Sequence, residues 1–183
     1  MTKAWGAAAV PAVLLACVPA APPATTSNGA TAGLCRTGER ALWQCPVGGK
    51  PASVCLGANS IHYRSASGAG EPLDIASDAS WSNIHIGGNR SQGGLNQDHI
   101  RFSSQGTHYV VHAGETGSLN ERPGLRVSGV AVLRGAAAEE MVESLDCRAG
   151  TPFVTGAFQA ISGAAPQEWD GEETDDDPFD AIY

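Results

Sequence analysis

The sequence predicts a mainly β domain, arranged as a small antiparallel sandwich or barrel that carries two disulfides. The chain has 183 residues, of which 23 are glycine and 11 are proline, a composition that favours turns and short strands over long helices. Short segments with strand-like side chains recur through its middle, and glycine-rich turns separate some of them. Closely spaced short strands with turn signals are typical of antiparallel sandwiches and barrels.

Two hairpin turns and one irregular position organise the expected strands. Gly48-Gly49 accepts the positive φ angles of a two-residue turn, and residues 104–106 form the second turn signal. Gly129 interrupts the alternation of the last strong segment, so we expect a bulge there. In chain order, the expected strands are residues 40–46, 51–56, 60–64, 81–86, 98–103, 107–112 and 125–133.

The end of the folded region can be interpreted in two ways. Residues 136–145 contain strong helix formers at helical spacing, which favours a helix. Met141, Leu145 and Cys147 also share one face of a strand, which favours a final strand instead. Farther along, residues 154–162 are expected to form one helical turn or two.

The negative charge is concentrated at the C-terminal end. The chain has a net charge of -8, yet eight acids and no base lie in residues 167–183, and the remaining residues hold 11 acids and 11 bases. A block of like charges repels itself, so residues 165–183 are expected to form a disordered acidic tail. No basic patch is present, which argues against nucleic acid as a ligand.

The N-terminal segment predicts export. Residues 1–16 have one lysine followed by an uncharged, mostly apolar stretch that is too short to span a bilayer, as in an export signal. Cys17 follows Leu-Leu-Ala, a pattern that resembles a bacterial lipobox and predicts lipidation, whereas cleavage before Ala21 would release a soluble protein. Residues 17–34 are uncharged and rich in Pro, Ala and Thr, as in a disordered tether. The favoured location is the periplasmic face of a bacterial membrane, held by the lipid alone; a soluble periplasmic or secreted protein is the alternative.

The cysteine count agrees with export. The chain has five cysteines, and four remain once Cys17 is lipidated or discarded, which allows two disulfides in an oxidising compartment. If Gly48-Gly49 is a two-residue turn, Cys45 lies opposite Ala52, so Cys45 and Cys55 point to opposite faces of the hairpin. Unless Cys147 stays free, a bridge must connect it to the N-terminal part. The pairing otherwise stays open among the candidates Cys35, Cys45, Cys55 and Cys147.

Several segments resemble a family of small, mostly uncharacterised exported bacterial proteins. They are "LWQCPVGGKPASVC", "IHYR", "IRFSSQGTHYVVHAG", "SGVAVLRG" and "SLDC", and the resemblance as a whole covers about Cys35 to Cys147. The chain departs from the pattern after "IHYR", where residues 65–68 read "SASG". The resemblance implies a β-rich exported domain with no established activity, and it supports a final strand over residues 141–147. From the residues themselves, we expect the folded domain to cover residues 35–164.

A weaker resemblance concerns periplasmic lysozyme inhibitors, one group of which uses a Ser-Gly-x-x-Tyr loop. Here "QGTHY" has Gln105 and Tyr109 at the outer positions of that pattern, and Ser103 and Ser104 lie just before it. The resemblance implies a binding loop whose hydroxyls hydrogen-bond catalytic carboxylates, with a cationic lysozyme steered by the acidic tail. The alternative is that these residues form an ordinary polar turn.

An enzymatic function has little support in the sequence. His108 and His112 share a strand face, but their Cβ atoms would lie about 13 Å apart at strand spacing, too far for one metal ion. His99 and His108 could pair across the turn instead. The glycines of residues 87–98 lack a strand–loop–helix setting for phosphate, so we expect a mobile surface loop there.

The sequence therefore favours a non-enzymatic exported binding domain without a cofactor. Two alternatives remain open. One is a structural or scaffold lipoprotein of the envelope, and the other is a metal-dependent enzyme that uses the hairpin histidines.

Overall fold

Two antiparallel sheets make up the fold in a computed structural model that describes residues 33–66, 72–90, 94–136, 140–147 and 150–171. Each sheet is a meander in which consecutive strands pair. The first sheet contains β1 (Arg40–Val47), β2 (Lys50–Leu56), β3 (Ile61–Ser65) and β4 (Leu73–Ala76). The second contains β5 (Ile84–Asn89), β6 (Leu95–Ser104), β7 (Thr107–Thr116), β8 (Arg126–Arg134) and β9 (Glu140–Asp146), and α1 (Ala157–Ala164) follows.

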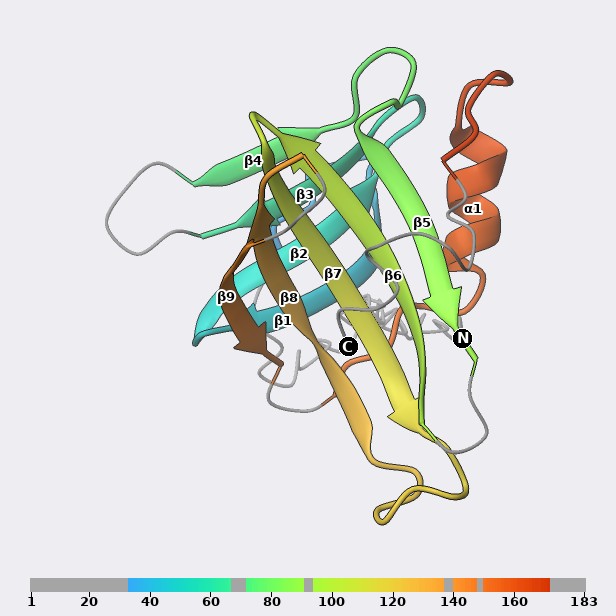
Figure 1. Cartoon of the computed structure of the whole chain (residues 1–183). Helices are drawn as coiled ribbons and strands as arrows, with labels where there is room; N and C mark the ends of the chain where they lie inside the picture. The colour runs from blue at the N-terminus through green and yellow to red at the C-terminus, as the bar shows by residue number, and fades with distance from the viewer. Residues whose placement is uncertain (1–32, 67–71, 91–93, 137–139, 148–149, 172–183) are drawn as a thin grey trace, which may run out of the picture.

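The sheets pack face to face with their strands running across one another (Figure 1). Alternate side chains of each strand enter the space between them, among them Trp43 and Val54 from the first sheet and Phe102 and Val111 from the second. Each large apolar side chain removed from water stabilises the fold by about 1.5–3 kcal/mol. The prediction of a mainly β fold, a small antiparallel sandwich or barrel, is therefore confirmed, and the structure has two antiparallel sheets.

Both predicted hairpin turns are present. Gly48 and Gly49 have φ angles of 56° and 82°, and Gln105 and Gly106 have 51° and 71°. Positive φ at both central positions identifies type I′ turns, which match the twist of antiparallel strands. These turns set the registers of β1 with β2 and of β6 with β7.

Several predicted boundaries need correction. The strand expected over residues 81–86 begins only at Ile84, because Trp81 has a φ of 60° in a turn. The surface loop expected over residues 87–98 is largely absent, since both of its ends are paired in β5 and β6. The missed strand β4 has only four residues, too few for a clear alternation pattern.

The bulge expected at Gly129 is also wrong. Pairing runs without interruption through Gly129, and the irregularity in β8 lies between Val132 and Leu133. A Cβ atom on Gly129 would lie 2.4 Å from the carbonyl oxygen of Leu145, so the glycine permits a close approach of β9.

The later elements follow the predictions more closely. β9 confirms the final strand over residues 141–147, and α1 confirms the helical turns near residues 154–162. The first residues of the predicted tail belong to the fold: Trp169 packs edge-on against Trp81, with ring centroids 6.0 Å apart.

The export signal, Cys17, nearly all of the tether and residues 172–183 lie outside the described residues. Within the described ranges, no helix has both the length and the apolar character needed to span a bilayer.

Candidate functional site

Two disulfides connect distant parts of the fold. Cys45 bonds to Cys147 and so joins β1 to the residue that follows β9, where Val47 and Cys147 also form an isolated β-bridge. Cys35 bonds to Cys55 on β2. The register places Cys45 opposite Ala52, and Cys45 and Cys55 lie on opposite faces of the first sheet, as the two-residue turn predicts. The expected long-range bridge from Cys147 is confirmed.

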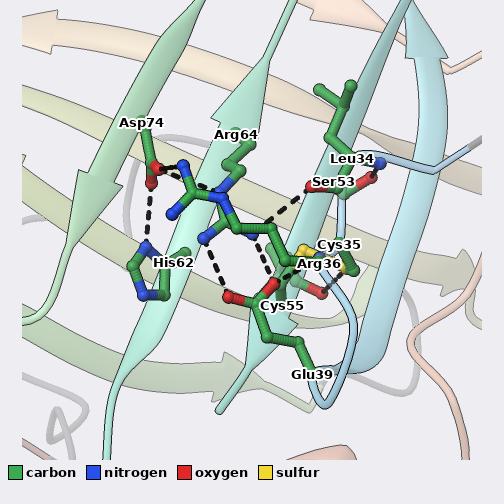
Figure 2. Close-up of a disulfide and its surroundings, with 10 residues drawn as sticks. Leu34, Cys35, Arg36, Glu39, Ser53, Cys55, His62, Arg64 and Asp74 are labelled. Atoms are coloured by element: carbon green, nitrogen blue, oxygen red, sulfur yellow. Dashed lines mark hydrogen bonds and ion pairs between the residues drawn. A yellow bond between two sulfur atoms is a disulfide. The ribbon is translucent and has the colours of Figure 1, made fainter.

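An ion-pair network surrounds the Cys35–Cys55 disulfide on the outer side of the first sheet (Figure 2). Arg64 lies at its centre, with a side chain only 6% exposed. It donates from Nη2 to Glu39 Oε1 at 2.9 Å and from Nε to Asp74 Oδ2 at 3.0 Å. Its Nη1 atom donates to the carbonyl oxygen of Leu34 at 3.3 Å and also contacts Glu39. The guanidinium therefore fastens the segment before β1 onto β3.

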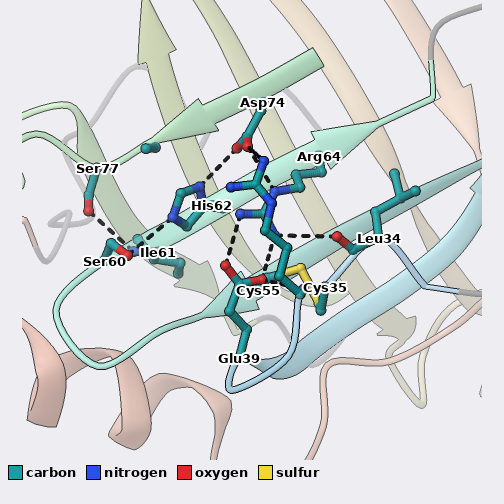
Figure 3. Close-up of polar contacts among 12 residues, drawn as sticks. Leu34, Cys35, Glu39, Cys55, Ser60, Ile61, His62, Arg64, Asp74 and Ser77 are labelled. Carbon is teal, nitrogen blue, oxygen red and sulfur yellow. Dashed lines mark hydrogen bonds and ion pairs between the residues drawn. A yellow bond between two sulfur atoms is a disulfide. The ribbon is translucent and has the colours of Figure 1, made fainter. Parts of the chain in front are cut away.

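The same network extends to His62 and the loop that follows β4 (Figure 3). The Nδ1 atom of His62 lies 2.8 Å from Asp74 Oδ1, and its Nε2 atom lies 3.1 Å from Ser60 Oγ. Ser77 Oγ accepts a hydrogen bond from the backbone N–H of Ile61 at 3.2 Å. These polar groups are used in contacts within the protein, so we assign the network a structural role.

The carboxylates of the network are held in their charged form. The hydrogen bond from Arg64 is the main cause that lowers the pKa of Glu39 to about 2. Burial alone would raise the pKa of Asp74, but hydrogen bonds from His62 and Arg64 outweigh it and lower that pKa. Folding therefore stabilises the ionised state of both groups.

The one cluster in the described ranges with metal-ligand spacing coincides with this disulfide. Candidate ligand atoms of Cys35, Glu39 and Cys55 lie within 4.8 Å of one another. Both sulfurs are consumed by the disulfide, and Glu39 is bonded to Arg64, so no thiolate is available for a metal ion.

The predicted binding loop forms the β6–β7 hairpin, but its residues do not converge. Ser103 Oγ lies 2.8 Å from His108 Nδ1 on the outer face of the second sheet. Tyr109 lies on the opposite face, where its ring centroid is 5.7 Å from that of Tyr63. Of the predicted residues, only Ser104 and Gln105 lie at the turn: Ser104 ends β6, and Gln105 is the first of the two central turn residues.

The hairpin histidines pair differently from the expectation. The register places His99 directly opposite His112, whereas His108 lies opposite Ser103 and bonds to the carbonyl oxygen of Gly135 at 2.8 Å. The predicted pairing of His99 with His108 is therefore wrong, because the type I′ turn fixes a register that separates these two residues along the strands.

A groove of about 600 Å³ lies at one end of the second sheet, and we call it the strand-end groove. The ends of β5, β6, β7 and β8 form one wall, and residues 150–156 with the start of α1 form the other. Its volume falls in the usual range for small-molecule sites, about 300–1,000 Å³. It is lined by Arg90, Asn96, Asp98, Ala113, Gly114, Glu115, Arg126, Gly150, Pro152, Phe153, Val154, Thr155, Gly156, Ala157, Phe158 and Gln159.

Hydrogen bonds to β1 position the loop wall of the groove. The backbone N–H of Val154 donates to the carbonyl oxygen of Leu42 at 2.9 Å, and Trp43 Nε1 donates to that of Thr151 at 3.2 Å. Phe153 and Phe158 meet edge to face with centroids 5.2 Å apart, and both pack against the core. Half-buried, they give the groove an aromatic floor.

The rim of the groove carries both signs of charge. Arg90 pairs with Asp98, and Arg126 Nε lies 3.4 Å from Glu115 Oε2. The side chains of Arg90 and Arg126 are 63% and 65% exposed. Ion pairs this exposed contribute only about 0–1 kcal/mol, so a charged ligand can replace either partner at little cost.

A smaller cavity of about 290 Å³ lies at the mouth between the sheets. Its lining includes Tyr63 and Tyr109, with Lys50 and Glu143 as its charged residues. Burial is the main cause that raises the pKa of Tyr63 to about 12. The phenol of Tyr63 therefore keeps its proton well above neutral pH.

The strand-end groove was not predicted from the sequence, because its walls come from four strand ends and a segment far along the chain. One local signal was present: Phe153 and Phe158 place two of the chain's four phenylalanines in a short segment. No protein-family model, curated protein or solved structure matches this chain.

Proposed function

We propose that this chain is an exported binding domain whose ligand site is the strand-end groove. One observation carries the proposal: exposed arginine and carboxylate side chains lie beside the half-buried Phe153–Phe158 pair in one groove. A concave site with an apolar floor and a few polar groups is the usual form of a ligand site. Export is supported by the two disulfides, since such bonds persist in oxidising compartments.

The charges and the aromatic floor favour a short peptide as ligand. A peptide carries ammonium and carboxylate groups together with an apolar side chain. Its carboxylate would pair with Arg90 or Arg126, its cationic group with Asp98 or Glu115, and its apolar side chain would cover Phe158. Binding would exchange weak exposed ion pairs for new ones while removing apolar surface from water.

Calorimetric titration with the free tripeptide Lys-Phe-Glu tests this proposal, and Ser-Gly-Ser serves as the control ligand. Arg126→Gln removes a rim charge, and Phe158→Ala removes part of the floor. Arg134→Gln is the matched control, because Arg134 is an exposed arginine at the far end of the same strand. We expect both groove substitutions to weaken Lys-Phe-Glu about tenfold, or about 1.4 kcal/mol, and the control to change affinity less than twofold.

Two results would overturn the peptide site. One is the absence of heat from Lys-Phe-Glu at millimolar concentration, and the other is equal loss of affinity in all three variants. Because Phe158→Ala also removes core contacts, its thermal unfolding is measured in parallel, and Arg126→Gln decides the outcome when that variant is unstable.

Lysozyme inhibition stays a separate prediction from the sequence resemblance. The assay measures lysozyme activity with micromolar full-length chain and with Gln105→Ala, which changes the exposed hairpin tip. Inhibition that Gln105→Ala abolishes would support the hairpin as the binding loop. Undiminished lysozyme activity would contradict it.

A further inference from the structure

The smaller cavity, of about 290 Å³ at the mouth between the sheets, is separate from the strand-end groove. Tyr109, near the start of β7, lines the smaller cavity. Gly114 and Glu115, near the end of the same strand, line the groove. The two cavities therefore lie at opposite ends of the second sheet and can hold different ligands.

The interior of the smaller cavity is apolar and aromatic. Tyr63 from the first sheet and Tyr109 from the second meet in its wall, with ring centroids 5.7 Å apart. The aliphatic side chains of the wall are Val47, Leu73, Val132 and Leu145. A cavity of about 150 Å³ is enough to hold benzene, so this one accepts a ring-sized group together with a small polar head. Tyr109 is half-buried, and its ring offers a surface on which an aromatic group can stack.

The lining contains one residue of each charge sign, and the two come from different sheets. Lys50 is the first residue of β2, and Glu143 lies on β9. Both side chains are exposed, and no ion pair or hydrogen bond within the described part of the chain engages either of them. Unlike the paired charges at the rim of the groove, these two are available to a ligand that carries both signs.

The Cys45–Cys147 disulfide holds the two charged walls near each other. It joins β1 to the residue that follows β9. The β1–β2 turn, which directly precedes Lys50, lies against β9, since a Cβ atom on Gly48 would be 3.7 Å from Leu145 Cδ2. The cavity is therefore largely preformed, and a preformed site loses less conformational entropy when it binds a ligand.

The charge of Glu143 acts on the interior of the smaller cavity. Burial is the main cause that raises the pKa of Tyr63 to about 12, and the hydrogen bond with Ser65 opposes it. The negative charge of Glu143 adds a smaller rise, so this carboxylate acts on the phenol from the opposite sheet. A ligand ammonium group at the mouth would be attracted by the carboxylate and by the faces of the tyrosine rings.

We propose that the smaller cavity binds a free aromatic amino acid. Its ring lies against Tyr109 and the aliphatic wall, its α-ammonium group pairs with Glu143, and its α-carboxylate pairs with Lys50. A residue inside a peptide chain lacks both of these charges, so the cavity selects the free amino acid. This inference is independent of the strand-end groove, and either site can fail its test without the other.

NMR titration of the full-length chain with millimolar L-phenylalanine tests this proposal. Two analogues each lack one charge: phenethylamine has no carboxylate, and 3-phenylpropanoate has no ammonium group. Glycine has the charged head without the ring. We expect L-phenylalanine to shift the ring signals of Tyr63 and Tyr109, and each of the other three compounds to bind about tenfold more weakly.

Two charge-neutralising variants identify the partner of each ligand group. Lys50→Gln should weaken L-phenylalanine and 3-phenylpropanoate about tenfold without weakening phenethylamine, because only a carboxylate loses its partner. Glu143→Gln should weaken L-phenylalanine and phenethylamine without weakening 3-phenylpropanoate. Glu140→Gln is the matched control, because Glu140 is an exposed acid of the same strand outside the cavity lining. It should change each affinity less than twofold.

Absence of binding by L-phenylalanine would overturn the proposal, and so would shifts confined to Phe153 and Phe158 in the strand-end groove. Equal weakening of the two analogues in either cavity variant would contradict the assigned charge pairs. Thermal unfolding is measured for each variant in parallel. If a variant fails to fold, the comparison of L-phenylalanine with its analogues on the unaltered chain decides the outcome.

Discussion

The guanidinium of Arg64 donates two hydrogen bonds to the carboxylate of Glu39 and fastens the segment before β1 to the outer side of the first sheet. This pair is nearly buried, and Asp74 supplies a second carboxylate on the other side of the guanidinium. Charge-assisted hydrogen bonds in this setting are stronger than exposed ion pairs.

Glu39→Gln should therefore destabilise the fold by about 2 kcal/mol near neutral pH. The pKa of Glu39 falls from 4.5 to about 2 on folding, so its contribution is complete above pH 4.5 and is lost as the pH falls to about 2. Urea unfolding at several pH values checks this, with Glu121→Gln as an exposed control. A stability difference that stays constant from pH 6 to pH 2 would contradict the assignment.

The two disulfides should contribute unequally. The Cys45–Cys147 bridge spans 102 residues and the Cys35–Cys55 bridge spans 20. In the chain-entropy account, the first restricts the unfolded chain by about 5 kcal/mol and the second by about 3 kcal/mol. Unfolding of the paired alanine variants Cys45→Ala/Cys147→Ala and Cys35→Ala/Cys55→Ala measures the order. A larger loss of unfolding free energy in Cys35→Ala/Cys55→Ala than in Cys45→Ala/Cys147→Ala would contradict this order.

Two glycine-to-alanine substitutions should change stability in opposite directions. At Gly129, the new Cβ would lie 2.4 Å from the Leu145 carbonyl oxygen, so β9 must shift at a cost of about 1–3 kcal/mol. At Gly163 in α1, no atom lies within 4 Å of the new Cβ, and alanine should stabilise the helix by about 0.5–1 kcal/mol. Thermal unfolding of both variants provides the measurement, and changes of the same sign would argue against these packing assignments.

The mature N-terminus should begin at a lipidated Cys17. Export of the full chain in a bacterial host, followed by intact-mass measurement, distinguishes the alternatives. A mass increase that corresponds to two or three acyl chains on a chain starting at Cys17 is the expected result. Cys17→Ala is the control and should release the protein from the membrane. A soluble product that begins at Ala21 would refute the anchor.

The local parts of this fold could be predicted because they depend on neighbouring residues. The Gly48-Gly49 turn sets the pairing of Cys45 with Ala52, and that pairing separates Cys45 from Cys55. The register shift beside Leu42 was beyond such reasoning, because both Leu42 and Trp43 are buried and the bulge depends on their packing in the finished core.

The candidate sites depend on contacts between distant segments. The strand-end groove needs Arg126 on β8 to lie near Phe158 on α1, and no pattern within either segment indicates that proximity. For the predicted binding loop, the spacing of the residues along the chain did not show which side chains would lie on the same face. Strand alternation sends Ser103 and Tyr109 to opposite faces, although both lie near the same turn.

The most direct test of the proposed binding site is NMR mapping of the labelled chain during titration with Lys-Phe-Glu. The proposal predicts that the largest shifts occur at Asp98, Glu115, Phe153 and Phe158, with smaller changes elsewhere. Shifts concentrated at Tyr63 and Tyr109 would place the ligand in the smaller cavity, and a spectrum without shifts would exclude this peptide; either result would contradict the strand-end groove as the binding site.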